Sequence, residues 1–169
     1  DKKIEQISSI SEKLTITKKY DLIICIAIYR RKKLLKQSID LINSFISDLP
    51  FTVGIVLVYS LDDDYNFITE YDNVHYHYSP NSPLGSKWLS GVLYSRLYSP
   101  KTIMILGSDD MVNKNYLIYG YNKIVKENYY LVYSDKWYTY DSNNKKLFIS
   151  KYKQTKRPRY GGIGAGRFW

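Results

Sequence analysis

The chain of 169 residues has very little of the two residue types that most often hold metals or form crosslinks. Cys25 is its single cysteine, and His75 and His77 are its two histidines. One cysteine cannot form an internal disulfide, and this inventory disfavours a four-ligand structural zinc site. The longest apolar run, 22–29, is far too short to cross a bilayer. We therefore expect a cytoplasmic protein with no transmembrane segment.

Positive charge and tyrosine are what the chain has in excess. Its 25 Lys and Arg residues against 16 Asp and Glu residues give a net charge of +9, which attracts phosphates and polyanions. Its 19 tyrosines accompany abundant Lys, Asn and Ile. Two interpretations of this composition stay open: an A/T-rich coding sequence, or an aromatic and basic surface of the kind that stacks nucleobases.

Apolar strands alternate with amphipathic segments through the middle of the chain. The β-branched run 22–28 predicts a strand buried on both faces of a sheet, and the spacing of three and four over 34–46 predicts a helix. The same patterns predict further strands over 51–59, 74–78 and 102–106 and helices within 81–100 and over 116–127. This order indicates an α/β fold: a Rossmann-like, mostly parallel sheet flanked by helices.

The two ends of the chain differ from this central pattern. Residues 1–19 predict a short helix or a connector, and 20–169 form the expected domain. A tyrosine-rich stretch from 129 to 151, with a turn at 141–144, predicts a smaller antiparallel C-terminal part, and the basic, glycine-rich tail that follows predicts irregular structure. The chain begins at Asp1 and stops in an apolar stretch, so we expect a piece of a longer polypeptide that is cut at its C-terminal end.

Ligands of parallel α/β sheets bind where the strands end, so the residues that follow each predicted strand are the candidates for function. Asp109 and Asp110 follow the fourth strand. Adjacent carboxylates repel, and a bound Mg²⁺ or Mn²⁺ would relieve that repulsion. The alternative is that one of them caps the next helix, with Gly107 making the turn.

Basic residues follow the first and third strands. The run 30–33 is cationic and lies where a helix begins. Positive charge at a helix N-terminus is electrostatically unfavourable, and a bound phosphate would neutralise it. The segment 81–87 combines a proline-glycine turn with Lys87, which could meet a phosphate. The alternatives are a solvated helix start for 30–33 and an ordinary surface loop with a solvated lysine for 81–87, and taken alone the second segment favours its alternative.

Taken in order, these segments resemble the nucleotide-sugar-binding half of GT-A glycosyltransferases of the family 2 type, including viral and phage members. The resemblance runs over residues 20–169 and rests on strand-Tyr29-Arg30-helix, on Asn81-x-Pro-Leu-Gly-x-Lys87-Trp-x-x-Gly91, on Ile-Leu-Gly-Ser-Asp109-Asp110, and on the later 133–141 and 164–167 segments. It implies a glycosyltransferase that moves a sugar from a nucleoside diphosphate, such as UDP, to a glycan, protein or small-molecule acceptor. A viral member would act in the host cytoplasm or with the virion.

The resemblance also assigns roles to residues. Asp109 corresponds to the metal-binding aspartate of the DxD motif, and Asp110 is its neighbour. The metal that the resemblance implies is Mn²⁺ or Mg²⁺. The nucleotide-sugar site would comprise Tyr29, Arg30, Asp62, Asp64, Asn81, Gly85, Lys87, Ser108 and Arg167. The chain departs from the pattern at Gly107, where many members carry an acid, so a ribose contact or part of the metal shell is missing or comes from elsewhere.

The general base that such an enzyme needs is not identified by the sequence. It usually lies beyond the point at which this chain ends, and Asp135 and Asp141 are weak substitutes that also fit a strand end and a turn. The alternative function is therefore a catalytically inactive glycosyltransferase-like module that binds or supports other domains of a longer polypeptide. Nucleic-acid binding ranks last, because the acidic pair opposes it at this edge.

Overall fold

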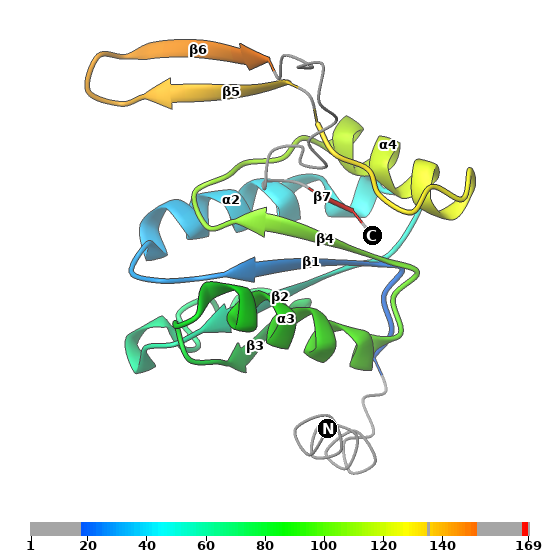
Figure 1. Cartoon of the computed structure of the whole chain (residues 1–169), viewed down its shortest axis with the longest axis horizontal. Helices are drawn as coiled ribbons and strands as arrows, with labels where there is room; N and C mark the ends of the chain where they lie inside the picture. Colours follow the sequence, from blue (N-terminus) through cyan, green and yellow to red (C-terminus); the bar gives the residue numbers. More distant parts are fainter. Residues whose placement is uncertain (1–17, 135, 152–166, 169) are drawn as a thin grey trace.

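The computed structural model describes residues 18–134, 136–151 and 167–168, and it has a five-stranded sheet at its centre (Figure 1). The strand order is β3-β2-β1-β4-β7. Four strands are parallel: β1 (Leu22–Ala27), β2 (Val53–Tyr59), β3 (Val74–Tyr78) and β4 (Thr102–Gly107). The expected α/β fold with a mostly parallel sheet is confirmed.

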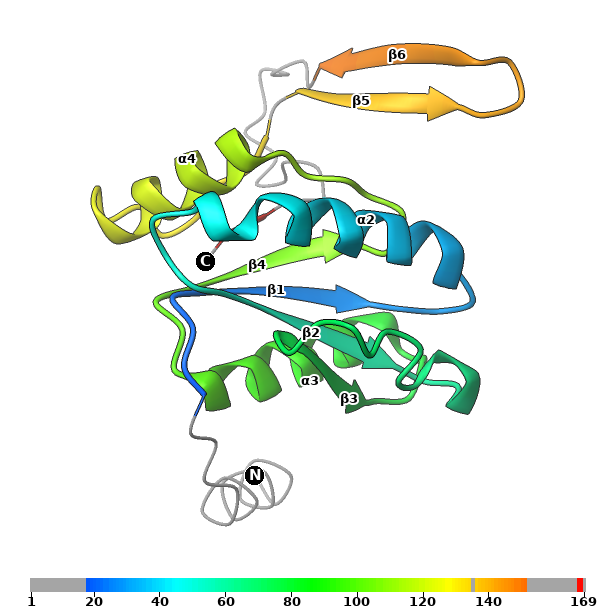
Figure 2. The same ribbon diagram turned by 180° about the vertical axis from the view of Figure 1, so that it is seen from behind.

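Helices cover both faces of this sheet. Figures 1 and 2 show α2 (Lys32–Phe45) and α4 (Lys114–Val125) on one face and α3 (Leu84–Ser95) on the other. Short 3₁₀ turns, η1 (Ile46–Asp48), η2 (Asp62–Asp64) and η3 (Arg96–Tyr98), follow α2, β2 and α3. Within 18–134, no helix is long and apolar enough to cross a membrane.

Strand β1 is buried on both faces, as its continuous β-branched run predicts. Leu22, Ile24 and Ile26 join the core beneath α2 and α4, and Ile23 and Cys25 join the core beneath α3. Cys25 is a buried free thiol, as expected of a small core residue. Strand β1 pairs in parallel with β2 on one side and with β4 on the other. The carboxyl ends of these three strands therefore lie at one edge of the sheet.

Helix α3 packs closely against the sheet because its buried stripe is made of small residues and one lysine. Lys87, Gly91 and Ser95 recur every four residues and are its buried positions. A Cβ at Gly91 would lie 2.8 Å from the Cys25 Sγ, so only glycine permits this approach. The stripe also carries Lys87 into the protein interior.

The C-terminal part is antiparallel, and it differs from the sequence-based expectation at its start. Strands β5 (Lys136–Asp141) and β6 (Lys146–Lys151) form the expected hairpin. Residues 129–133, however, form no strand: Val132 makes one isolated bridge to Phe168. The tyrosine side chains of that run are exposed, so alternation with a core face, which a strand needs, is lacking.

A two-residue strand, β7 (Arg167–Phe168), pairs antiparallel with β4 at the edge of the main sheet. Phe168 is fully buried and packs against Tyr116, and a Cβ at Gly120 would collide with its ring. Two residues are too few to show periodicity, so the sequence did not predict this strand. The predicted helix or connector at 1–19 and the predicted irregular tail lie almost wholly outside the described residues.

Candidate functional site

The site lies where the chain reverses its direction across the sheet. From β1 the chain runs outward through β2 and β3, and it then returns to β4 on the other side of β1. Such a switch point, between the carboxyl ends of β1 and β4, is where parallel α/β sheets open a crevice for ligands. Arg31 follows β1, Asp109 follows β4, and the Nη1 of Arg31 lies 2.6 Å from the Oδ2 of Asp109.

The Arg31–Asp109 ion pair is exposed, with about half of each side chain open to solvent. Exposed pairs of this kind contribute about 0.2–1 kcal/mol to stability. A phosphate could therefore replace Asp109 as the partner of Arg31, or a cation could replace Arg31 as the partner of Asp109, with little loss of free energy. The pair shows that the acidic turn and the basic turn face each other across the switch point, as the sequence predicted.

Arg30 has a left-handed backbone conformation, with φ of 59°, which is uncommon for a residue other than glycine. Its N–H donates to the Oδ2 of Asp64 at 3.3 Å, and its guanidinium lies over the Tyr29 ring, 5.0 Å from the centroid. Asp64 is buried in η2. Because unusual conformations persist only where neighbours enforce them, Asp64 is a positioning residue for this loop.

Lys87 supports the same loop through the main chain of Ile28. Its Nζ donates to the main-chain oxygen of Ile28 at 2.6 Å and to the Oδ1 of Asn81 at 3.1 Å, and the residue is 1% exposed. Burial lowers the pKa of this ammonium, and the nearby Asp64 carboxylate opposes that shift. The ammonium therefore holds the loop after β1 rather than standing open to solvent.

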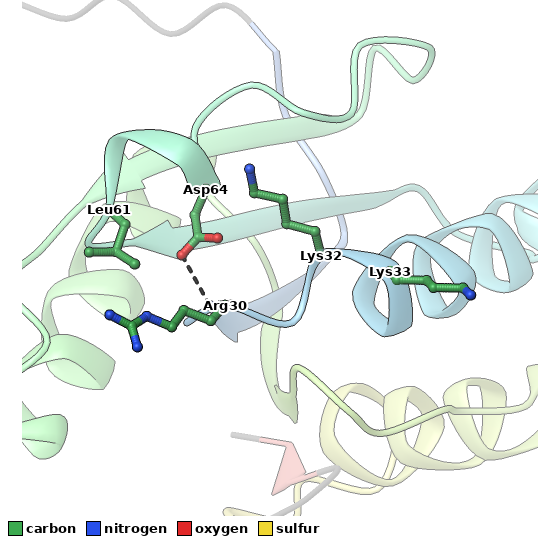
Figure 3. Close-up of a pocket in the computed structure, with 5 residues that line it drawn as sticks. All are labelled: Arg30, Lys32, Lys33, Leu61 and Asp64. Atoms are coloured by element: carbon green, nitrogen blue, oxygen red, sulfur yellow. Dashed lines mark hydrogen bonds between the residues drawn. The ribbon is translucent and has the colours of Figure 1, made fainter. Parts of the chain in front are cut away.

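A pocket of about 500 Å³ opens beside this loop (Figure 3). It is lined by three cationic side chains, Arg30, Lys32 and Lys33, together with Leu61 and Asp64. The volume is within the range of small-molecule sites. In Figure 3 the charged ends of the three cations point in different directions, so they would have to turn to meet a single phosphate.

The start of α2 makes this pocket more positive. Its N-cap, Arg31, makes no side-chain capping bond, and its first turn carries no acid. The unpaired N–H groups and the helix dipole add to the charge of Lys32 and Lys33, which disfavours the helix start without an anion. An anion such as a phosphate is the ligand that this arrangement fits.

Asp110 turns inward, unlike Asp109. Its Oδ2 accepts the N–H of Gly107 at 3.1 Å, and its main-chain oxygen accepts the hydroxyl of Ser38 at 2.8 Å. Burial, and then the charge of Asp109, raise the pKa of Asp110. The capping alternative is wrong, because Asn113 is the N-cap of α4 and its side chain accepts the N–H of Tyr116. Asp110 instead accepts the N–H of Gly107, the last residue of β4.

The turn also explains Gly107. A Cβ at this position would lie 3.1 Å from the Cγ of Asp110 and closer still to its carboxylate oxygen. A side chain at 107, including the acid that the resemblance leads one to expect, would therefore displace Asp110 from its hydrogen bond. The departure at Gly107 has a packing reason in this turn.

The residues of this turn fit a divalent ion only if the phosphates of a bound diphosphate supply some of its ligands. Within the described ranges, no three His, Cys, Asp or Glu side chains come together as a metal-binding group. Asp109 has the more accessible carboxylate, and Arg31 already contacts it. Mg²⁺ is commonly bound by one or two carboxylates together with substrate phosphates and water, which is the arrangement that Asp109 could support.

The other predicted nucleotide-sugar residues are placed around this edge with different accessibility. Tyr29 and Asp62 are exposed in the loops after β1 and β2, and Asn81 is exposed beside Lys87. Gly85 has open space beside it, and Ser108 is buried in the turn after β4. Arg167 lies in β7 opposite Ile105, so it belongs to the far edge strand rather than to the pocket lining.

Neither candidate base gains support. The carboxylate of Asp141 accepts three hydrogen bonds, from the N–H groups of Asn143 and Asn144 and from the Asn144 side-chain amide. These bonds lower its pKa and make it a turn residue, as the alternative interpretation had it. Asp135 lies outside the described residues.

The two histidines share one face of β3, but they contact aromatic rings rather than each other. His75 stacks on Tyr98 and is hydrogen-bonded to the Tyr20 hydroxyl, and His77 stacks on Tyr94. Burial lowers the pKa of both, so both are neutral at pH 7. The structure thus places them in the packing between β3 and the helix above it.

Sequence reasoning did not single out Arg31, Lys32, Lys33 and Leu61 as individual site residues. The cationic run 30–33 had signalled a phosphate, but only the geometry separates Arg31, which turns to Asp109, from the pocket-lining lysines. The burial of Lys87 could have been inferred from its four-residue spacing to Gly91 and Ser95.

No protein-family model matches the chain, and a search of curated proteins finds no significant match.

Proposed function

We propose that the chain binds a nucleoside-diphosphate sugar at the carboxyl edge of the sheet and transfers the sugar to an acceptor hydroxyl. Two observations carry the proposal: the cationic pocket between the segments that follow β1 and β2, and the Arg31–Asp109 pair at the switch point between β1 and β4. The resemblance to GT-A glycosyltransferases motivates the choice of a nucleotide sugar among phosphate ligands.

In this function the residues of the β1–α2 loop bind the diphosphate. Lys32, Lys33 and Arg30 would turn toward it, and Asp64 and Lys87 would keep the loop in place. The bond between the anomeric carbon and the phosphate oxygen breaks as the acceptor oxygen forms its bond. The cations stabilise the negative charge that the departing diphosphate gains.

A divalent ion, Mn²⁺ or Mg²⁺, would be held by Asp109 together with the phosphates, and it would supply Lewis-acid stabilisation of the leaving group. Arg31 would then exchange Asp109 for a phosphate oxygen. The acceptor proton must pass to a base, and none of the described carboxylates is assigned that role.

The experiment is calorimetric titration of the chain with UDP and other nucleoside diphosphates, with and without Mn²⁺, followed by an assay of sugar-nucleotide hydrolysis. We expect binding that Asp109→Ala weakens in the presence of Mn²⁺, and binding that the double variant Lys32→Ala with Lys33→Ala weakens under both conditions. The control is Lys126→Ala, because Lys126 is an exposed lysine at the C-cap of α4 and is not among the residues that line the pocket. Absence of binding under either condition, with Asp109→Ala indistinguishable from the parent, defeats the proposal.

A second function, a glycosyltransferase-like module that binds the nucleotide without turnover, is favoured by one observation. The inward position of Asp110 leaves Asp109 as the more accessible carboxylate of the turn, and Asp141 is held in a turn. Nucleotide binding without release of sugar in the hydrolysis assay would support this module over the enzyme.

A further inference from the structure

The β5–β6 hairpin extends beyond the helices that cover the sheet (Figures 1 and 2). One of its faces carries four large apolar side chains that are exposed within the described chain. Tyr138 lies opposite Ile149, and Tyr140 lies opposite Leu147, so these four side chains share that face. Each of them is between 59% and 65% exposed. An isolated two-stranded hairpin is at best marginally stable in water, so this face calls for a partner.

The charges of the hairpin indicate what kind of partner. Lys136, Lys145 and Lys146 are exposed on it. Asp141 is the single acidic residue of 136–151, and the hydrogen bonds of the turn lower its pKa and keep it charged, so lysines outnumber acids on the hairpin. A second copy of the chain would bring lysines against lysines, whereas an anionic surface would neutralise them.

We propose that this hairpin lies flat on an anionic lipid bilayer, with the face of Tyr138, Tyr140, Leu147 and Ile149 toward the membrane. Tyrosine rings are favoured at the level of the headgroups, and aliphatic side chains of an amphipathic surface element reach the boundary with the acyl chains. Lysines near the surface are attracted to anionic headgroups. In the hydrated headgroup layer the two free strand edges keep water as their hydrogen-bond partner, which the hydrocarbon core would not allow.

The opposite face of the hairpin supports this orientation. It carries Thr139, Asp141 and Lys146 as well as Trp137 and Phe148, whereas the first face carries Lys136 beside its four apolar side chains. The opposite face is therefore the more polar of the two. The hairpin is therefore amphipathic across its two faces rather than apolar at its tip, which favours lying on a bilayer over insertion end-on. This inference rests on the hairpin alone and is independent of the proposed nucleotide-sugar site.

The test is flotation of the whole chain with phosphatidylcholine vesicles and with vesicles that also contain phosphatidylserine. We expect binding to the anionic vesicles that added salt weakens, and about a fivefold fall in partition coefficient for each of Lys136→Gln and Lys145→Gln. Lys146→Gln should cause a smaller fall, because Lys146 lies on the face away from the bilayer. A variant with Tyr138, Tyr140, Leu147 and Ile149 all changed to Ser should lose vesicle binding. Tyr119→Ser with Leu89→Ser, two exposed apolar residues of α4 and α3, is the matched control and should bind as the parent does.

Thermal melting of each variant checks that the body of the protein remains folded. If neither vesicle binds the parent, or if the four-serine variant, still folded, binds as well as the parent, the proposal is overturned. It is also overturned if the hairpin variants abolish binding to RNA or dimerisation while leaving vesicle binding unchanged, because the face would then serve a nucleic acid or a second copy.

Discussion

The Nζ of Lys87, on helix α3, lies 2.6 Å from the main-chain oxygen of Ile28, at the end of the first strand. This single contact connects the buried face of α3 to the loop that forms the cationic pocket. Two residues further along that loop, the N–H of Arg30 donates to Asp64. Two buried charged residues thus hold the segment whose exposed cations would meet a phosphate.

Lys87→Met should destabilise the fold and weaken nucleotide binding together. The change leaves the Ile28 oxygen without its donor and the Asp64 carboxylate without its neighbouring charge, at a cost of about 1–3 kcal/mol in the free energy of unfolding. Urea unfolding measures the first effect and calorimetry the second. Lys33→Met, an exposed lysine of the pocket, should weaken binding while leaving stability unchanged; equal stability of the two variants would contradict the positioning role of Lys87.

Two glycines of α3 should respond in opposite directions to alanine. At Gly91 the new Cβ meets Val58 and Cys25, so Gly91→Ala should destabilise by about 1–3 kcal/mol. At Gly85 nothing lies within 4 Å, so Gly85→Ala should stabilise the helix by about 0.5–1 kcal/mol. Urea unfolding compares them. If Gly85→Ala keeps stability but weakens UDP binding, the backbone of Gly85 approaches the ligand, as the sequence predicted.

The stability of the fold should fall as the pH drops below neutrality because of His75. Burial, with the charge of Lys18 as the lesser cause, lowers the pKa of His75 to about 4 from its ordinary 6.5. Because the folded-state pKa of His75 is lowered, the stability that its neutral form contributes is fully present above pH 6.5 and is lost as the pH falls toward 4. Urea unfolding between these pH values measures the slope.

His75→Phe should flatten this slope, since phenylalanine keeps a ring to stack on Tyr98 but does not titrate. His77, whose pKa burial also lowers, adds a slope of the same sign that this variant retains. An unchanged pH dependence in His75→Phe would show that other groups are responsible.

Arg31→Gln should increase the dependence of nucleotide binding on Mn²⁺. Without Arg31 the Asp109 carboxylate no longer has its cationic partner. An ion bound together with the diphosphate should then bind up to about fivefold more tightly, which corresponds to the free energy of one exposed ion pair. In the absence of Mn²⁺ the same variant should bind UDP more weakly, since one cation is lost. Calorimetry under both conditions measures the two effects. The same change in affinity with and without Mn²⁺ would mean that Arg31 and the ion do not compete for Asp109.

The order of strands and helices followed from the sequence because the determining patterns are local. The run 22–28 has no polar residue, so it could only be a strand buried on both faces, and the spacing over 34–46 could only bury one side of a helix. The same reasoning placed the acidic and basic turns at one edge of the sheet, because parallel strands end at the same edge. The Arg31–Asp109 contact agrees with that placement.

Burial and pairing were decided by the tertiary structure, since they depend on neighbours that are distant in the sequence. The chain shows Lys87 as a lysine in a turn-rich segment, but packing of α3 against β1 places its ammonium on the Ile28 oxygen, 59 positions away. Asp109 and Asp110 are adjacent and chemically identical, yet one reaches Arg31 and the other returns to Gly107, because a peptide chain turns successive side chains in different directions. Composition and periodicity determined which elements form and where polar groups gather. Only the packed fold determined which of those groups line the pocket and which hold the loop beside it in place.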